Sequence, residues 1–514
     1  MSRRIHRRFP FALSSCIAIA LMLAFLCRVS PAEPDQDLNG PATAAAVTGN
    51  SELRDAAARW VGRHCMAFYL AGEKVGFEVN SIHIEEADPR PLLRMTTESR
   101  YEVEMFGERS VTEVTASEWF TLEGEGELVR YLSEQTEDGT KTVVRGTVKD
   151  GRFEVERTVA GETSRRSIER PKASLRETLR LDQFLSSKTE PRAVLETWSI
   201  DDEAEDFNLL TRTTLVARES VGSGADARTV YEVDSESDGM VVRVKAYDAV
   251  RLISMKAGGL MEGRAEPEAT ARWAEAARVD MKELSFVRIE RNMGAEAADL
   301  KEVVLLVEGV AGFGIPASPE QSVERIGDGK CRVRLQRESR TATVEALDDQ
   351  ARAKFVREEA GIECDSEAIR SRANSIVGSV TDPVARVALI QRWVYQNMGK
   401  GGKQSNSALA ILKQRSGDCT EHARLFVALA RSLGLPSREV GGLLYFNDGR
   451  PGFGWHAWAE VHDGVRWIGV DPSWDQVGLD AGHLGMHFDQ DDMSWVNILG
   501  SLKISVESFS AALN

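Results

Sequence analysis

The residues best suited to chemistry are a cysteine, a histidine and an aspartate in the C-terminal part of the chain. Cys419 follows Gly417-Asp418 and opens a segment whose apolar residues recur at helical spacing. At the start of a helix, free amides and the positive end of the dipole lower the pKa of a thiol and can hold an oxyanion. A buried, inert cysteine is the alternative. The polar neighbours Thr420 and Glu421 favour a functional thiol.

The histidine and the aspartate belong to two alternating segments joined by Asp463-Gly464, a dipeptide typical of two-residue hairpin turns. Such a turn would place His456 directly opposite Asp471, with their Cβ atoms about 4.5–5.5 Å apart on one face. The carboxylate would then fix the tautomer of the imidazole and stabilise its charged form. A plain surface pair is the alternative, and three tryptophans in these segments argue against it.

A thiol beside an oriented imidazole provides the nucleophile and the base that acyl transfer requires. Cys419 would attack an amide carbonyl. His456 would take the thiol proton, or already hold it in an ion pair, and later protonate the leaving amine. Asp471 would orient His456, and the acyl-enzyme would react with an amine or water.

Three blocks in this part of the chain resemble the transglutaminase-like superfamily, in its bacterial secreted branch. They are AILKQRSGDCTEHARLFVALARSLGLPSREVGGLLYF, GWHAWAEV and WIGVDPSWDQVGLDAGH, and together they span roughly residues 380–490. The resemblance implies a papain-like α+β core and a Cys-His-Asp triad, whose roles fall on Cys419, His456 and Asp471. Relatives include cross-linking enzymes, cysteine proteases, peptide amidases and inactive members, so the resemblance implies the chemistry better than the substrate.

Other side chains near these blocks are candidates for binding substrate or an oxyanion: Gln391, Gln404, Asn406, His422, Trp455 and Trp458. The first three could supply the second oxyanion donor that the resemblance implies, and the sequence does not choose between them. The histidine either lines the site or caps the helix. The tryptophans either exclude water, which would favour an amine acceptor, or pack in the core.

A metal is the competing interpretation of the same region. His483 and His487 are four residues apart, with several aspartates nearby, but no HExxH motif accompanies them. The acidic run FDQDDM is too irregular for a calcium loop. Zinc on the cysteine, histidine and aspartate of the expected triad is less compatible with the order of the blocks. We therefore expect no metal and no cofactor.

The elements that position these residues follow an α+β order. In 349–514, helical patterns precede the strand-like VGGLLYF, WHAWAEV and VRWIGV, as expected for a papain-like or transglutaminase-like core. Residues 56–280 alternate polar and apolar side chains around Asp-Gly turns, which predicts a large, mostly antiparallel β region, open or curled. We expect a short β segment or linker at 281–348 and a disordered linker at 33–55.

The N-terminus predicts export. Residues 1–32 combine Arg3, Arg4, Arg7 and Arg8 with the apolar run FPFALSSCIAIALMLAFLC, which is typical of a signal peptide. Cleavage after Ala32 would release the rest of the chain, and an uncleaved membrane anchor is the alternative. Either way, the protein is expected in the periplasm, outside the cell, or anchored facing outward.

Composition limits the partners. The 514 residues are 42% hydrophobic and 28% charged, as in ordinary globular proteins, and the net charge is −16. Nucleic acid and anionic membrane surfaces are therefore poor partners, apart from membrane attachment through an uncleaved anchor. Four cysteines lie beyond the expected signal, too few for a disulfide framework in so long a chain.

These observations predict a secreted transglutaminase-like enzyme that performs acyl transfer or hydrolysis at peptide or isopeptide amide bonds. Its partner would be a protein or peptide with an amide carbonyl. The alternative is a non-catalytic binding or scaffold protein with a vestigial transglutaminase-like domain, in which the β region carries the binding or scaffold function. The complete set of triad residues favours the enzyme.

Overall fold

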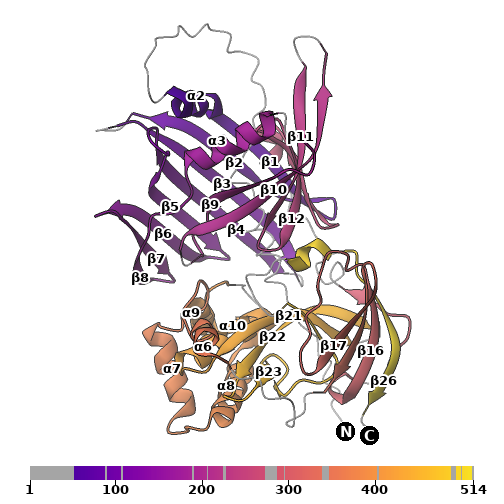
Figure 1. Ribbon diagram of the computed structural model, residues 1–514. Coiled ribbons are helices and arrows are strands. Elements are labelled where there is room, and N and C mark those ends of the chain that lie inside the picture. Colours follow the sequence, from indigo (N-terminus) through magenta and orange to yellow (C-terminus); the bar gives the residue numbers. More distant parts are fainter. Residues whose placement is uncertain are drawn as a thin grey trace. The chain divides into compact units, whose positions relative to one another are not determined.

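The chain consists of two compact units, a β unit that includes Val111–Val279 and a C-terminal unit that includes Asp280–Asn514 (Figure 1). A computed structural model describes residues 51–86, 90–105, 108–187, 190–204, 206–223, 227–272, 286–294, 296–337, 347–401, 405–447, 449–487, 494–498 and 500–511. The expected signal segment 1–32 lies outside these residues, as does Gln404. Within the described ranges, no helix is long and apolar enough to cross a membrane.

The β unit is built on one antiparallel sheet of fourteen strands. Its strands are β1 (Gly62–Leu70), β2 (Glu73–Glu85), β3 (Leu92–Met105), β4 (Glu108–Thr121), β5 (Leu128–Glu137), β6 (Thr140–Lys149), β7 (Arg152–Val159), β8 (Glu162–Ile168), β9 (Val194–Ile200), β10 (Asn208–Val221), β11 (Arg228–Ser237), β12 (Met240–Ala246), β13 (Leu252–Ala257) and β14 (Met261–Ala265). The order runs from β8 back to β1, crosses to β14 and continues back to β9. The expected large antiparallel β region is therefore confirmed.

The tight turns of this sheet follow from its Asp-Gly pairs. At Asp138-Gly139, Asp150-Gly151 and Asp238-Gly239, both residues have positive φ. Two consecutive positive φ angles define the mirror-image turn that matches the twist of a hairpin, and aspartate and glycine tolerate that conformation best. The dipeptides thus set the ends of three hairpins, as the sequence predicts.

The sheet is curled rather than flat. Phe207, between β9 and β10 at one edge, contacts Tyr131 of β5 and Phe153 of β7, with ring centroids 5.0 and 5.4 Å apart. The Tyr131 hydroxyl also donates to Asp202 Oδ2 at 2.6 Å. Helices α2 (Ser51–Trp60) and α3 (Leu175–Ser186) share this hydrophobic core (Figure 1). The short helix α4 (Glu268–Ala271) follows the sheet.

Phe207→Ala should destabilise the β unit by about 3–5 kcal/mol, because it removes a fully buried ring that joins two distant parts of the sheet. Urea unfolding of the full chain would measure this loss. Leu210→Ala is the matched control: this side chain of β10 is 40% exposed, and its loss should change the free energy of unfolding by less than about 0.5 kcal/mol. Equal effects of both substitutions would contradict the curled core.

The C-terminal unit places helices before its main sheet, which confirms the α+β order. The helices are α6 (Asp349–Lys354), α7 (Glu367–Val377), α8 (Pro383–Asn397), α9 (Ala408–Gln414) and α10 (Cys419–Ser432). The sheet contains β21 (Ser437–Phe446), β22 (Gly452–His462), β23 (Trp467–Asp471), β24 (Gln476–Val477) and β25 (His483–His487), in the order β24-β23-β22-β21-β25. The short β15 (Val287–Arg288) pairs with β22. Residues of α10 and β22 share one core with α7, α8 and α9.

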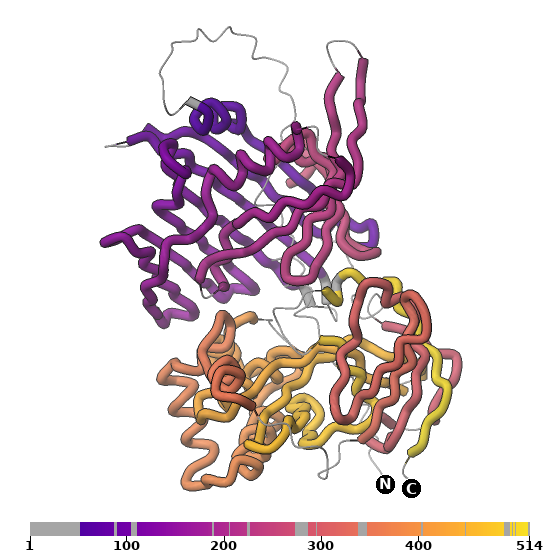
Figure 2. The backbone as a smooth tube through the Cα atoms, viewed as in Figure 1, coloured from indigo at the N-terminus to yellow at the C-terminus, as the bar shows by residue number. Residues whose placement is uncertain are grey.

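A second sheet uses residues that the sequence had suggested as a separate short segment or linker. Strands β16 (Leu300–Glu308), β17 (Gln321–Gly327) and β18 (Lys330–Gln336) form a sheet with β26 (Lys503–Ala511). Figure 2 shows β26 running beside β16. The segment 281–348 therefore contributes strands to the C-terminal unit. At the other boundary, helix α2 begins at Ser51, inside the expected linker 33–55.

The remaining short elements are β19 (Gly399–Lys400), β20 (Ser416–Gly417) and the 3₁₀ helices η2 (Ala297–Asp299) and η3 (Ser494–Ile498). Strands β19 and β20 pair in parallel, and β20 directly precedes α10. The cysteines of the described residues are all free thiols: Cys65, Cys331, Cys364 and Cys419.

Candidate active site

The candidate nucleophile occupies the first position of helix α10. Asp418 is the N-cap: its Oδ1 accepts from the Thr420 amide at 3.0 Å, and the Glu421 carboxylate accepts in return from the Asp418 amide at 2.9 Å. This reciprocal capping box satisfies amides that the helix itself cannot. A side chain at Gly417 would collide with the Glu421 side chain. The GDCTE sequence thus fixes Cys419 at the start of the helix.

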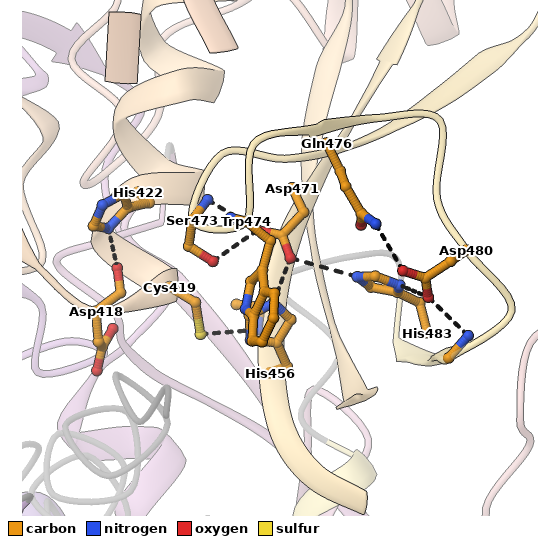
Figure 3. A network of polar contacts seen from close by, with 12 residues as sticks. Asp418, Cys419, His422, His456, Asp471, Ser473, Trp474, Gln476, Asp480 and His483 are labelled. Carbon is orange, nitrogen blue, oxygen red and sulfur yellow. Dashed lines mark hydrogen bonds and ion pairs between the residues drawn. The ribbon is translucent and has the colours of Figure 1, made fainter. Parts of the chain in front are cut away.

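The histidine and the aspartate of the expected triad are hydrogen-bonded and completely buried. His456 Nε2 lies 2.7 Å from Asp471 Oδ2 (Figure 3). An ionised carboxylate only accepts, so Nε2 carries the proton and the neutral ring keeps its lone pair on Nδ1. That Nδ1 is buried and has no hydrogen-bond partner among the described residues. The ring is therefore oriented with its basic nitrogen available.

The hairpin that joins these two residues differs from the expected one. His462 pairs with Trp467, so that four residues, 463–466, form the turn instead of two. Asp463 Oδ1 accepts from the amides of Val465 and Arg466, at 2.8 and 2.9 Å, which favours the longer turn. The predicted direct opposition of His456 and Asp471 is wrong by two residues. Because side chains alternate with a period of two, the shift leaves both on one face.

The sulfur of Cys419 lies against strand β22, next to the histidine. The Ala457 amide donates to Sγ at 3.2 Å, and Figure 3 shows the thiol pointing toward the His456 side. Burial raises the pKa of the Cys419 thiol well above its ordinary value, and the charges of Asp418, Asp471 and Glu421 add to that rise, while the Ala457 amide opposes it. The sequence suggested a lowered pKa for the Cys419 thiol, because the start of the helix can be predicted from the sequence and the burial of the thiol cannot. The thiol is neutral at neutral pH.

A second histidine contacts the same aspartate. His483 on β25 places Nε2 3.4 Å from Asp471 Oδ2 and Nδ1 3.0 Å from Asp480 Oδ1 (Figure 3). Asp480 also accepts from the Gly482 amide and from Gln476 Nε2, at 2.8 and 2.7 Å. Because both nitrogens of His483 face carboxylate oxygens, both must be protonated, which requires the charged ring.

The pKa shifts agree with this charge pattern. Burial by itself lowers the pKa of His483, but Asp480 and Asp471 outweigh it and raise that pKa to about 10. Burial by itself raises the pKa of Asp471, but His456 and His483 hold it well below its usual range. At neutral pH, His483 is therefore an imidazolium between two carboxylates. The sequence analysis did not predict the contact between His483 and Asp471. The three-residue spacing of Asp480 and His483 was a signal for the pairing of those two residues.

The opposite oxygen of Asp471 is also fully used. Oδ1 accepts from the Ser473 amide at 2.9 Å, the Ser473 hydroxyl at 2.7 Å and the Trp474 amide at 3.2 Å. These donors come from the turn directly after the aspartate, in the DPSW sequence. The resemblance had identified the aspartate but not its neighbours as part of the site.

Two of the other candidates, both suggested as oxyanion donors, have different partners. Gln391, buried on α8, donates from Nε2 to Asp475 Oδ1 at 3.0 Å. Asn406 Oδ1 accepts from Arg424, which also pairs with Glu439. Neither contact involves Cys419, and Gln404 lies outside the described residues. Each of the two described side chains is therefore held by a contact outside the expected triad.

The remaining candidates divide between the site and its surroundings. His422 Nδ1 lies 2.5 Å from the Asp418 carbonyl, within the first turn of α10, and its Nε2 is buried without a partner in the described part of the chain. Trp458 packs beside His456 and against His483, with ring centroids 6.2 and 5.2 Å apart. Trp455 instead contacts Trp495 and His487. Trp458 thus borders the paired imidazoles, whereas Trp455 packs elsewhere.

One group of described residues has the composition of a metal site. Ligand atoms of His456, Asp471 and His483 lie within 4.8 Å of one another. The two imidazoles already donate to the shared carboxylate, and a charged His483 has no lone pair to offer a metal. His487 lies on the same strand and stacks on Trp455 and Trp495. The arrangement fits a chain of charge-assisted hydrogen bonds better than a metal centre.

Comparison with known proteins identifies the type of domain that contains these residues. Residues 370–472 match the transglutaminase-like superfamily. The chain therefore contains a transglutaminase-like domain, and the matched range includes Cys419, His456 and Asp471. An uncharacterised protein of Haemophilus influenzae is 32% identical over 84 residues, which are 15% of this chain and 22% of that relative. The match thus spans about a fifth of the relative's length.

Two solved structures are also similar. A protein of Cytophaga hutchinsonii, provisionally named a cysteine protease, is 18% identical with a TM-score of 0.29, over 42% of this chain and 91% of that one. A protein of Parabacteroides distasonis, provisionally named a protease, is 12% identical with a TM-score of 0.17, over 67% of this chain and 68% of that one. At these TM-scores, neither likeness defines a shared overall fold.

Gly417→Ala should destabilise the C-terminal unit by about 1–2 kcal/mol, the typical cost of losing a helix cap, because the new methyl group would displace Glu421. Thermal unfolding of the full chain measures the effect. Gly314→Ala is a suitable control, since a Cβ at that position meets no atom within 4 Å. If both variants unfold like the wild type, the close approach of Gly417 and Glu421 is incorrect.

The charge on His483 predicts a pH dependence of stability. Its pKa is raised on folding, so its contribution is complete below the unfolded value of about 6.5 and is lost as the pH rises through about 10. The stability difference between wild type and His483→Gln should therefore shrink from pH 6.5 to pH 10. Calorimetric unfolding of both proteins across this range measures it. A constant difference would show that His483 is not charged in the folded state.

Proposed function

We propose that this chain is an exported transglutaminase-like enzyme in which Cys419 is the nucleophile, His456 the base and Asp471 the orienting group. The observation that carries the proposal is the orientation of His456. Its Nε2 is bound to Asp471 at 2.7 Å, its Nδ1 is left without a partner in the described residues, and the sulfur of Cys419 is held by the adjacent amide of Ala457. This geometry supports nucleophilic catalysis at a carbonyl carbon.

The neutral thiol favours general-base catalysis over a preformed ion pair. As Sγ bonds to the amide carbon, Nδ1 of His456 takes the thiol proton and the carbonyl oxygen becomes an oxyanion. The intermediate then expels the amine, which receives that proton from His456. Water or a second amine attacks the thioester in the same way, with His456 again as base, and releases Cys419. Asp471 stabilises the imidazolium at each step and stays ionised.

The start of α10 is the proposed place for the oxyanion. The Thr420 amide is used by the Asp418 side chain, and the His422 amide donates to the Asp418 carbonyl at 3.1 Å. The amide of Cys419 itself lies in the first turn, where the partial positive charge of the helix is concentrated. It is the main-chain donor that we assign to the oxyanion.

The proposed substrate is a protein or peptide amide, including isopeptide bonds. The transglutaminase-like domain supports amide chemistry. Export is proposed from the basic and apolar N-terminus alone. Both hydrolysis and transfer to an amine follow from the same thioester, so the acceptor decides between them.

Replacing Cys419 by Ala should abolish peptide hydrolysis and amine incorporation, measured with glutamine-bearing peptides and a fluorescent amine. His456→Ala should lower kcat by about 10²–10⁴-fold, the usual contribution of a general base. Asp471→Asn should lower kcat by less, because the part of Asp471 is to orient His456. The double variant Cys419→Ala/His456→Ala should be no worse than Cys419→Ala alone, since the two residues act as a unit.

Cys331→Ala is the matched control, because it removes another buried, free thiol of the C-terminal unit, and it should keep full activity. Turnover is the required measurement, since alkylation of a thiol that is 1% exposed would be slow in an active and in a vestigial site alike. If Cys419→Ala kept wild-type turnover, or if EDTA removed it, the thiol mechanism would be wrong. If no amide substrate were turned over, the scaffold alternative would replace it.

A further inference from the structure

A second imidazole and a second carboxylate extend the candidate triad. Oδ2 of Asp471 is shared by Nε2 of His456, at 2.7 Å, and Nε2 of His483, at 3.4 Å. The other nitrogen of His483 lies 3.0 Å from Asp480 Oδ1. Figure 3 shows these four side chains in one continuous row. Their atoms are buried, so the charges interact in a medium that screens them weakly.

We propose that His483, held by Asp480, is a positioning residue that keeps a fixed positive charge on the triad carboxylate and thereby keeps His456 neutral and basic. This inference rests on the proposed function only in taking His456 as the base. His483 would not touch the substrate. It would act through Asp471, and Asp480 would act through His483.

The surroundings of His483 contain the charges that this role needs. From β22, His456 and Trp458 face it, with ring centroids 6.0 and 5.2 Å away. Asp471 faces it from the end of β23, and Asp480 from the turn before β25. On the neighbouring strand β21, its register partner is the apolar Leu444. In the described part of the chain, the charged groups that the ring contacts are thus two carboxylates, which fix its proton on both sides.

A fixed cation at this position changes the balance between thiol and imidazole. A carboxylate alone would strongly favour the imidazolium form of His456 and so the thiolate–imidazolium pair. His483 offsets part of the Asp471 charge and repels a proton on His456 directly. Together with the burial that keeps the Cys419 thiol protonated, this favours an uncharged pair at rest. Proton transfer is then deferred until a carbonyl carbon is attacked.

The test is an NMR pH titration of the full chain labelled with ¹³C-histidine, whose eight histidines are assigned by single substitutions. In the wild type, His483 should stay protonated to about pH 9, since its pKa is raised to about 10. In His483→Gln, which keeps a donor but removes the charge, the midpoint of the His456 titration should rise by about one to two pH units, as expected for loss of a cation 6 Å away. In Asp480→Asn, His483 itself should titrate at least about one unit lower.

His487→Gln is the matched control, since His487 is on the same strand and stacks on Trp455; it should leave the His456 midpoint unchanged. A purely structural role of His483 would lower activity at every pH without moving that midpoint. The inference is overturned if wild-type His483 titrates near its ordinary value. It is equally overturned if the His456 midpoint stays fixed in folded His483→Gln. Should His483→Gln not fold, the wild-type and Asp480→Asn titrations still decide.

The pH profile of kcat/KM separates this inference from the proposed function. In an active enzyme, the acidic limb of the profile should move upward in His483→Gln together with the NMR midpoint. If the midpoints move as expected but no amide is turned over, the proposed function fails and the charge network stands. If amides are turned over and neither midpoint moves, the proposed function stands and the inference about His483 fails.

Discussion

The C-terminal unit depends most on one buried charge, the carboxylate of Asp471. An ionised carboxylate removed from water is costly unless hydrogen bonds replace its hydration. Here one oxygen accepts from Ser473 and Trp474, and the other faces His456 and His483. These partners come from the turn after β23, from β22 and from β25. The positions of three segments that are separate in the sequence therefore depend on the same charge.

The close approach of β25 to β21 makes this coupling possible. At Gly442, a Cβ atom would collide with the Leu484 carbonyl and lie 2.7 Å from the ring of Trp458. At Gly441, it would collide with the ring of His487. The Gly-Gly pair of β21 thus leaves room for β25 and its imidazoles. Without that room, His483 could not reach the carboxylate, and the second charge would be absent from the site.

The sequence predicted what depends on local signals and missed what depends on burial and distant pairing. The helix start at Cys419 and the shared face of His456 and Asp471 follow from a cap sequence and from strand periodicity. The exact register did not, because the side chain of Asp463 stabilises a longer turn than its dipeptide suggests. The raised thiol pKa arises from burial, which no local pattern encodes. The pairing of β16 with β26 joins segments far apart along the chain and likewise could not be predicted from the sequence.

The strand order of the large sheet has a consequence for how the β unit forms. Every neighbouring pair from β8 to β1, and from β14 to β9, is consecutive in the chain, so each half is a meander of hairpins with low contact order. The pairing of β1 with β14, in which Met66 meets Ala265, is the single exception in this sheet. Closing that loop carries an entropy cost that no hairpin shares. Each meander can therefore form from local hairpins, and we expect the joining of β1 to β14 to be the slow, non-local step of assembly.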